Sequence, residues 1–232
     1  MEKEGPLAIS ISRLKGCGGA YIGQNLARSL GMLYLDRALS EEIANKLDES
    51  IEYVEQNEER LVGVWESMIE KLQFSNPWSY SPPPAHVPAA EVSHPEMEAI
   101  ANIAAEKSIV VVGRGASCVL RNHPKHVSVF LYASRHWRLQ RTQEIYSLSR
   151  ADAAKLIDRV DLERARAKKS ITGLDICDAT QYHIAVDTGV LGLEAAEELI
   201  LQYIRFRFGD KQIEPPSKNT HARTRGSKYA AP

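Results

Sequence analysis

Residues 7–31 place an apolar strand, a glycine-rich turn and an amphipathic helix in direct succession. Leu7, Ile9 and Ile11 alternate with smaller residues, as in a β-strand. Three glycines then leave the backbone free to wrap around an anion. These glycines are Gly16, Gly18 and Gly19. A helix that begins beside Gly19 would direct its unpaired N–H groups and the positive end of its dipole into the turn. The segment therefore predicts a phosphate cradle.

The same turn lacks two side chains of the phosphate-binding pattern GxxxxGK[ST]. Aligned with that pattern, Arg13 stands at the first glycine, Gly19 at the lysine and Ala20 at the hydroxyl residue. The lysine normally neutralises charge on the terminal phosphates, and the hydroxyl holds Mg²⁺. The turn is therefore interpreted either as a phosphate cradle or as a tight connection that binds nothing.

Length and composition indicate one globular domain over residues 1–210. The chain has 232 residues, of which 44% are hydrophobic and 25% charged, and its formal net charge is -1. This balance gives no indication of a nucleic-acid partner. No apolar run approaches the roughly 20 residues that span a bilayer, and the opening MEKEGPL lacks the apolar stretch of a secretion signal. We therefore expect a cytoplasmic protein without a membrane partner.

The three cysteines are widely spaced and form no CxxC pair: Cys17, Cys118 and Cys177. We therefore expect reduced thiols rather than disulfides or a zinc site, and we predict no metal ligands in the chain. Cys17 lies in the glycine-rich turn, where a helix N-terminus could make it reactive by lowering the pKa of its thiol. The interpretation of Cys17 as a small residue in place of serine is favoured over that one.

Strands and helices alternate along the rest of the chain, which predicts an α/β fold with a doubly wound parallel sheet. Further strands are expected at 33–36, 108–113, 126–133 and 183–188. Helices are expected at 39–74, 96–106, 135–146, 149–173 and 193–206. Residues 75–95 hold six prolines and predict a long surface excursion. The basic tail at 211–232 is expected to be disordered, with nucleic-acid binding the weaker alternative.

Charged residues follow the ends of the expected strands, where ligands bind in such sheets. They are Arg13, Asp36, Arg114, Arg135 and Asp187. Arg138 and Arg141 lie one turn apart on the helix after the fourth strand. Guanidinium groups suit phosphoryl transfer because they offer forked donors to phosphate oxygens and stay charged throughout. Each arginine alone is more often a solvated surface residue, so only their convergence at one edge favours a site.

Residues 149–173 form a strongly charged helical stretch between the last two expected strands. Arg159, Arg166 and Lys169 lie broadly along one side of this helix, and Gly173 ends it. One hypothesis is a solvated helix face. The other, which its position favours, is a lid that closes over phosphates, excludes water and supplies the positive charge that the glycine-rich turn lacks.

Four separated places carry a resemblance to a known family. They are ISRLKGCGGAYIGQNLARSLG, YLD at 34–36, VVGRGAS at 111–117 with FLYASRHWRLQR at 130–141, and DLERARA at 161–167 with VDTGVLGLEAAEELI at 186–200. In this order and spacing, across roughly residues 7–207, they resemble the cytidylate kinase-like branch of the P-loop nucleoside monophosphate kinases. The resemblance implies a P-loop NTPase fold with a helical lid. It also implies transfer of the γ-phosphoryl group of ATP, with Mg²⁺, to a small-molecule nucleotide such as cytidylate.

The resemblance also implies roles for individual residues. The donor phosphates would be cradled by Gly16, Cys17, Gly18, Gly19, Ala20 and Tyr21. Residues facing the acceptor nucleotide would be Asp36, Arg114 and Arg138, with Arg141 a weaker candidate. From the lid, Asp161 and Arg164 would act on the reacting phosphates, with Arg166 a weaker candidate. Arg13 or Lys15 would replace the missing lysine of the turn.

Several positions depart from the family pattern. Besides Gly19 and Ala20, Gly115 replaces the acid of the GRD segment, Arg37 interrupts YLDTG, and Ile157 stands where the lid usually has another arginine. A slow or differently specific kinase fits these departures. A nucleotide-binding regulatory protein that no longer catalyses fits them as well, and a purely structural α/β domain is the least favoured alternative.

Overall fold

A computed structural model describes residues 5–48, 62–69, 82, 84–85 and 94–209. The strands are β1 (Ala8–Arg13), β2 (Leu33–Asp36), β3 (Ile109–Val112), β4 (His126–Tyr132) and β5 (Ile184–Asp187). The helices are α1 (Gly19–Leu30), α2 (Arg37–Asp48), α4 (His94–Glu106), α5 (Ala116–Val119), α6 (Arg135–Tyr146), α7 (Arg150–Thr172), α8 (Thr188–Leu191) and α9 (Leu193–Phe208), with a 3₁₀ turn η2 (Ala179–Gln181). Residues 62–69 are also helical.

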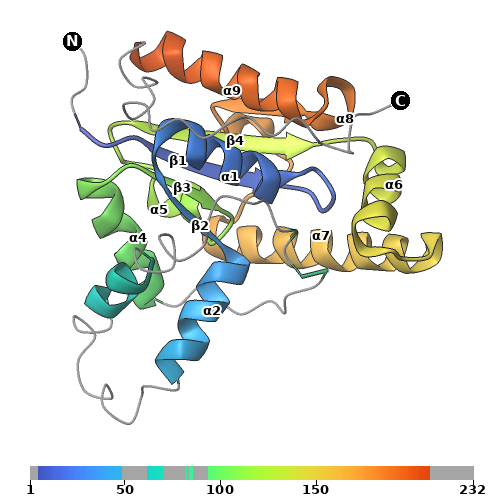
Figure 1. Cartoon of the computed structure of the whole chain (residues 1–232), viewed down its shortest axis with the longest axis horizontal. Helices are drawn as coiled ribbons and strands as arrows, with labels where there is room; N and C mark the ends of the chain where they lie inside the picture. The colour runs from blue at the N-terminus through green and yellow to red at the C-terminus, as the bar shows by residue number, and fades with distance from the viewer. Residues whose placement is uncertain (1–4, 49–61, 70–81, 83, 86–93, 210–232) are drawn as a thin grey trace, which may run out of the picture.

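The five strands form one parallel sheet in the order β2-β3-β1-β4-β5. β1 is the central strand, and its Ile9 lies level with Val110 of β3 on one side and Val127 of β4 on the other. Figure 1 shows helices on both faces of this sheet, α6 beyond the end toward which the strands run, and α7 running back from α6 below the strand ends. The predicted doubly wound α/β fold is confirmed.

Two apolar layers hold the helices to the sheet. On one face, α1 and α9 pack on β1 and β4 through side chains such as Ile22, Leu26 and Ile200, all fully buried. On the other face, α4, α5 and residues 62–69 cover β2 and β3. All four residues of β3 are buried, as its continuous apolar sequence predicted. This double coverage fixes the strand ends that carry the charged residues.

The expected elements match the structure with small shifts of their ends. Helix α4 begins at His94, two residues before the expected start, because Pro95 fits the first turn of a helix, where its missing N–H is not needed. The long helix expected over 39–74 is represented by α2 and by residues 62–69, and its other parts lie outside the described residues. Most of the proline-rich stretch 75–95 and the whole tail 211–232 lie outside them too. Within the described part of the chain, no helix has the length and apolar character needed to cross a membrane.

Candidate functional site

The glycine-rich turn leaves β1 at Arg13 and enters α1 at Gly19, as predicted. Gly16 and Gly18 have φ angles of 92° and 77°, in the left-handed region that favours glycine. Gly18 is the N-cap of α1, and no side chain caps this end of the helix. The first turn of α1 also lacks an acidic residue. The amino end of the helix therefore faces the turn with its dipole uncompensated, as an anion site requires.

The Arg13 side chain lies across Gly19. A Cβ atom placed at Gly19 would be 2.9 Å from Cγ of Arg13, and one at Gly113 would collide with Nη1 of Arg13. The arginine thus runs from β1 over the start of α1 to the end of β3. Among the described residues, no hydrogen bond or ion pair engages its guanidinium group. Burial lowers the pKa of Arg13, an effect that Asp36 opposes.

Two pockets meet at this arginine. The first, here called the loop pocket, follows the glycine-rich turn and is lined by Arg13, Leu14, Lys15, Gly16, Cys17, Gly18, Gly19, Ala20, Asp36, Arg37, Ala38, Pro84, Ala85, Arg141, Thr142, Ile145, Tyr146, Val160 and Arg164. The second, here called the lid pocket, lies between the ends of β1 and β3 and helix α7. It is lined by Ser12, Arg13, Arg37, Gly113, Arg114, Gly115, Ala116, Ser117, Cys118, Glu163, Arg164, Ala167, Lys168, Ile171 and Ile176. Three arginines border both pockets: Arg13, Arg37 and Arg164.

Helix α7 is tied to the glycine-rich turn through Asp161. The backbone N–H of Lys15 donates to Oδ1 of Asp161 at 2.6 Å, and Nη1 of Arg138 donates to Oδ2 at 2.5 Å. Arg138 also donates to the backbone oxygens of Lys15 and Ala133. Farther along α7, Nη1 of Arg164 donates to the backbone oxygen of Arg13 at 3.2 Å. These contacts hold α6, α7 and the turn in one arrangement.

The loop pocket concentrates positive charge. Nζ of the buried Lys15 donates to the oxygen of Ala85 at 2.8 Å and to the Tyr146 hydroxyl at 3.2 Å. Burial, together with Arg164 and Arg13, lowers the pKa of Lys15 to about 7. Burial and Arg13 likewise lower the pKa of Arg164 to about 9. Asp161 opposes both shifts but forms no ion pair with either side chain among the described residues, so these neighbouring cations favour the entry of an anion.

Comparison with known proteins places this site in a family. A family model described as the cytidylate kinase-like family matches residues 8–190. The chain belongs to the cytidylate kinase-like family.

Relatives of this family member cover the chain unevenly. It is 32% identical over 98 residues to the cytidylate kinase of Thermoplasma volcanium (strain ATCC 51530 / DSM 4299 / JCM 9571 / NBRC 15438 / GSS1). That match spans 42% of this chain and about half, 52%, of the relative's length. An uncharacterized protein from Eubacterium ventriosum shares the fold with a TM-score of 0.62 and 20% identity, over 85% of this chain and 98% of that one. Shikimate kinase from Acinetobacter baumannii has a TM-score of 0.44 and 16% identity, over 87% and 94% of the two chains.

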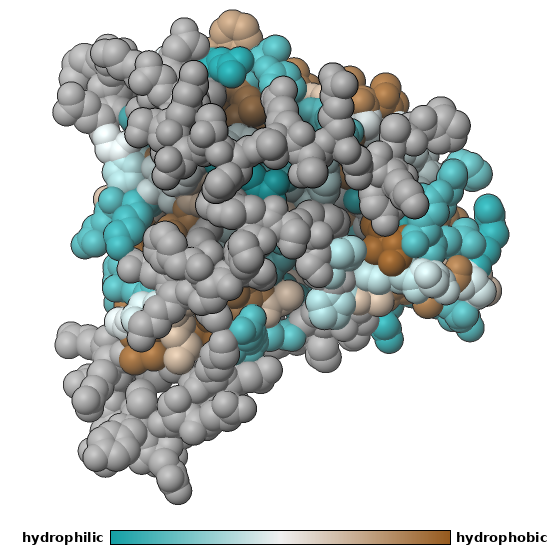
Figure 2. Space-filling model, in the orientation of Figure 1, coloured by the Kyte–Doolittle hydropathy of each residue, from teal (hydrophilic) through white to brown (hydrophobic). Residues whose placement is uncertain are grey.

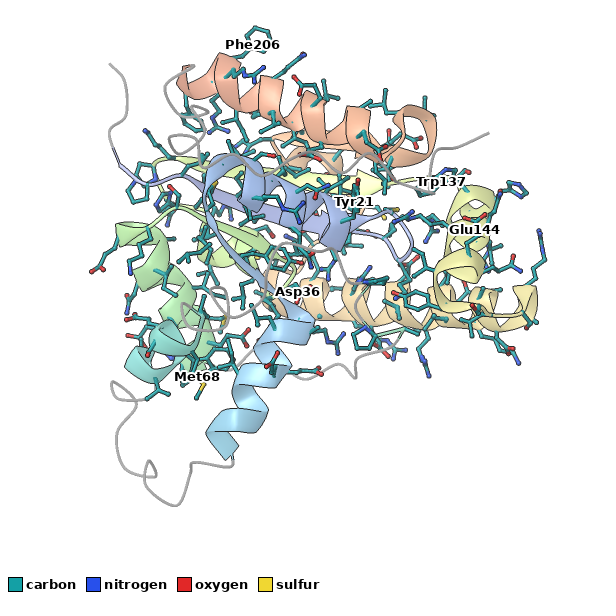
Figure 3. The ribbon with its side chains drawn as sticks, viewed as in Figure 1. Tyr21, Asp36, Met68, Trp137, Glu144 and Phe206 are labelled. Carbon is teal, nitrogen blue, oxygen red and sulfur yellow. The ribbon has the colours of Figure 1, made fainter. Side chains whose placement is uncertain are left out.

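Most of the residues predicted for the site of this cytidylate kinase-like protein line a pocket. Gly16 to Ala20 line the loop pocket together with Arg13, Asp36, Arg141 and Arg164, and Arg114 lines the lid pocket. The Asp36 carboxylate accepts hydrogen bonds from the Tyr34 hydroxyl at 2.8 Å and from the backbone N–H of Leu39 at 3.0 Å. Figure 3 shows Asp36 where β2 passes into α2. It therefore also orders the start of α2, next to the pocket.

Five predicted residues have partners of their own or lie away from the pockets. Arg114 makes a two-point ion pair with the buried Glu96, which also accepts a hydrogen bond from Ser40. Arg138 and Asp161 line neither pocket; they pair with each other, and each also forms a hydrogen bond with the backbone of Lys15 in the turn. The Tyr21 hydroxyl donates to Glu194 of α9 at 3.3 Å, and Figure 3 shows Tyr21 at the start of α1. Arg166 is exposed on α7 and lines neither pocket.

The remaining strand-end residues and Cys17 are structural in this fold. Arg135 pairs with Asp158 on the exposed side of α6 and α7. Asp187 caps the short helix α8 by accepting hydrogen bonds from Gly189 and Val190. Cys17 is fully buried, and burial raises the pKa of its thiol to about 12. Burial and the raised pKa support the interpretation of the Cys17 side chain as a small packing group, because a buried thiol with a raised pKa is unreactive.

Sequence analysis did not assign three residues that the pockets contain. Arg37 borders both pockets; its Nε atom lies 3.5 Å from Glu41, and its Nη2 atom is buried without a hydrogen-bond partner among the described residues. Ser117 and Lys168 face each other in the lid pocket. Arg37 directly follows the end of β2, a position that could have indicated a site residue. Nothing in the sequence pairs Ser117 with Lys168, because their contact joins α5 to α7.

Proposed function

We propose that this protein transfers the γ-phosphoryl group of ATP to a nucleoside monophosphate, with cytidylate as the preferred acceptor. The observation that carries the proposal is the unengaged Arg13 guanidinium between the loop pocket and the lid pocket. A donor in one pocket and an acceptor in the other would bring their reacting phosphates together beside this group. Membership of the cytidylate kinase-like family and the similarity to a cytidylate kinase support the choice of substrates.

The chemistry of such a transfer is positioning and charge stabilisation. The bond between the γ-phosphorus and the β,γ-bridging oxygen of ATP breaks as an oxygen of the acceptor phosphate bonds to the same phosphorus. The turn and the amino end of α1 hold the donor phosphates. Arg13 and Arg164 stabilise the charge that moves onto the transferred group and the bridging oxygen. Arg13 thereby takes the role of the absent lysine, since its stem occupies the space beside Gly19.

The residues around the turn fit a nucleotide that brings its own metal ion. The loop pocket supplies one carboxylate, Asp36, and no hydroxyl at Ala20. Among the described residues, no group of three or more metal-ligating side chains gathers. Mg²⁺ commonly keeps phosphate and water ligands and takes one or two carboxylates from the protein. Asp36 would be that carboxylate, and the ion would neutralise phosphate charge.

A coupled assay of the purified protein with ATP, Mg²⁺ and a panel of nucleoside monophosphates tests the proposal. We expect a nucleoside diphosphate and ADP to form in equal amounts, with the highest kcat/KM for cytidylate. The absence of product from every monophosphate at high enzyme concentration would contradict the proposal. Product formed only from another monophosphate would refute cytidylate as the acceptor but would support the proposed phosphotransferase activity.

A second candidate function is a nucleotide-responsive regulatory protein. The observation that favours it is the pairing of Asp161 with the Lys15 amide, which fills part of the turn with a carboxylate of the protein. The missing lysine and hydroxyl at positions 19 and 20 point the same way. This function predicts that ATP raises the melting temperature of the protein while no monophosphate is turned over. Turnover at any appreciable rate would exclude it.

A further inference from the structure

Ser117 and Lys168 form a polar pair on the wall of the lid pocket. Nζ of Lys168 on α7 donates to Oγ of Ser117 on α5 at 2.9 Å, and it lies 3.8 Å from Sγ of Cys118. It also lies 5.5 Å above the ring of Tyr182. The pair bridges α7 and the segment that follows β3, so it forms only when the two elements lie against each other.

The pair presents hydrogen-bond donors to the pocket. No carboxylate among the residues that the structure describes lies within ion-pair distance of Lys168. A hydroxyl has one O–H donor and two acceptor lone pairs. Because Oγ of Ser117 already accepts from Lys168, its own hydrogen can be donated to a ligand or to Sγ of Cys118, which lies 3.9 Å away. Two neighbouring donors, one of them charged, therefore face any ligand in this pocket.

A different cation, Arg37, lies where the lid pocket meets the loop pocket. Arg37 lines both pockets, its Nε atom lies 3.5 Å from Oε1 of Glu41, and its Nη2 atom is buried without a hydrogen-bond partner in the described part of the chain. Glu163 approaches its Nη1 only to 3.9 Å. A buried N–H group without a partner, such as that of Nη2, is costly unless a ligand satisfies it. The planar fork of the guanidinium suits two oxygens of a phosphate.

We propose that the lid pocket selects the acceptor by its base, an inference that rests on the proposed kinase function. Arg37, with Arg13 and Arg164, holds the acceptor phosphate at the junction. Ser117 and Lys168 hold the base through two neighbouring hydrogen-bond acceptors, as on the O2 and N3 edge of cytosine. Uracil carries an N–H donor at N3, which the Lys168 ammonium cannot accept because it has donors only. The apolar side chains of Ile171 and Ile176 border the same pocket and suit the faces of a base.

Selectivity between cytidylate and uridylate tests this assignment. Ser117→Ala and Lys168→Met are compared with wild type in KM and kcat for both monophosphates, and in binding of each monophosphate measured by calorimetry. We expect Ser117→Ala to raise KM for cytidylate about 10-fold and Lys168→Met to raise it roughly 10- to 100-fold, because lost hydrogen bonds to neutral and charged donors differ in this way. KM for uridylate should change much less, so the preference for cytidylate should shrink. ATP affinity should be unchanged.

Matched variants separate recognition from stability. Lys155→Met and Ser170→Ala alter exposed residues of the same helix and should leave the preference intact. Ser117→Thr keeps the hydroxyl and should therefore keep the preference for cytidylate as well. Equal changes for both monophosphates, or a parallel loss of ATP binding, would refute the role of the pair. If wild type neither binds nor converts any monophosphate, the proposed function fails, and the inference fails with it. Wild-type turnover with unaltered selectivity in both variants overturns the inference alone.

Discussion

The stem of Arg13 crosses Gly19 so closely that the two residues depend on each other. A β-carbon at position 19 would meet Cγ of Arg13 at 2.9 Å, Cδ at 3.2 Å and Cβ at 3.4 Å. Contacts this short at the base of a side chain cannot be relieved by moving its far end alone. A lysine at position 19 and the present position of Arg13 are therefore incompatible. The glycine that looks like a lost catalytic lysine makes room for another cation.

Gly19→Ala tests this relation. The added methyl group should displace Arg13 and raise the Kd for ATP by about 10-fold or more, since charge-assisted hydrogen bonds to phosphate are lost. Calorimetric titration with ATP measures the effect. Gly63→Ala is the control, because Gly63 is helical and its added methyl group would meet no atom within 4 Å. It should stabilise the protein by up to about 1 kcal/mol and leave ATP binding unchanged. Equal ATP affinity in both variants would show that Arg13 does not contribute to ATP binding.

Lys15 links the stability of the protein to pH. Folding lowers the pKa of Lys15 from 10.5 to about 7, mainly through burial. Between these values the unfolded chain binds the proton and the folded protein does not, so stability rises with pH across this window. Below about pH 7 the buried ammonium is charged, and its full cost is present. A bound polyphosphate would reduce that cost by pairing with the charge.

Lys15→Met removes this titration. The free energy of unfolding of the variant minus that of wild type should fall by about 1–3 kcal/mol between pH 7 and pH 9, because only wild type gains stability there. Urea unfolding at three pH values in this range measures the difference. The exposed Lys155→Met should show a difference that is constant with pH. A constant difference for Lys15→Met would mean that Lys15 stays charged in the folded protein.

Helix α7 is held to the rest of the protein by an apolar face and by polar contacts, among them those of Asp161 with the glycine-rich turn and Arg138. Ile157, where the family pattern has a further arginine, is fully buried in a small core with Leu139 and Ala153 between α6 and α7. A charged side chain there would lack a partner, so this departure from the pattern strengthens the packing of α7. Figure 2 shows hydrophilic residues gathered on the surface at the end where α6 and α7 lie. The predicted lid is thus an amphipathic helix, and its closing movement stays a prediction.

Asp161→Asn measures how strongly α7 holds the turn. The amide keeps the shape of the carboxylate but loses the charge that meets Arg138 and one of the two acceptor oxygens. We expect the free energy of unfolding to fall by about 1–3 kcal/mol. Asp158→Asn on the same helix removes the exposed ion pair with Arg135 and should change stability much less, since water screens such pairs. Chemical denaturation of both variants makes the comparison, and equal losses would show that Asp161 does not clamp the turn.

The order of the strands explains why the arginines converge. β1 is central, the chain places β2 and β3 on one side of it, and it then places β4 and β5 on the other. In such sheets the connections diverge at the central strand, and a crevice opens beyond its carboxyl end. The lid pocket includes Ser12 and Arg13 at the end of β1, and the loop pocket begins at Arg13. Arg37, which directly follows β2, lines both pockets. Arg164 lines both pockets as well and belongs to α7, the helix that lies between β4 and β5 along the chain.

The sequence by itself determined the parallel sheet, the glycine-rich turn and the set of arginines at one edge. These features depend on local patterns, such as the apolar run of β3 and the glycine spacing before α1, which act over a few residues. Only the tertiary structure decided which charged side chains form ion pairs within the protein. Arg114 is neutralised by Glu96 and Arg138 by Asp161, whereas among the described residues the Arg13 guanidinium forms no ion pair and Nη2 of Arg37 has no hydrogen-bond partner. Such pairings form between elements distant along the chain, so they depend on how the helices pack on the sheet.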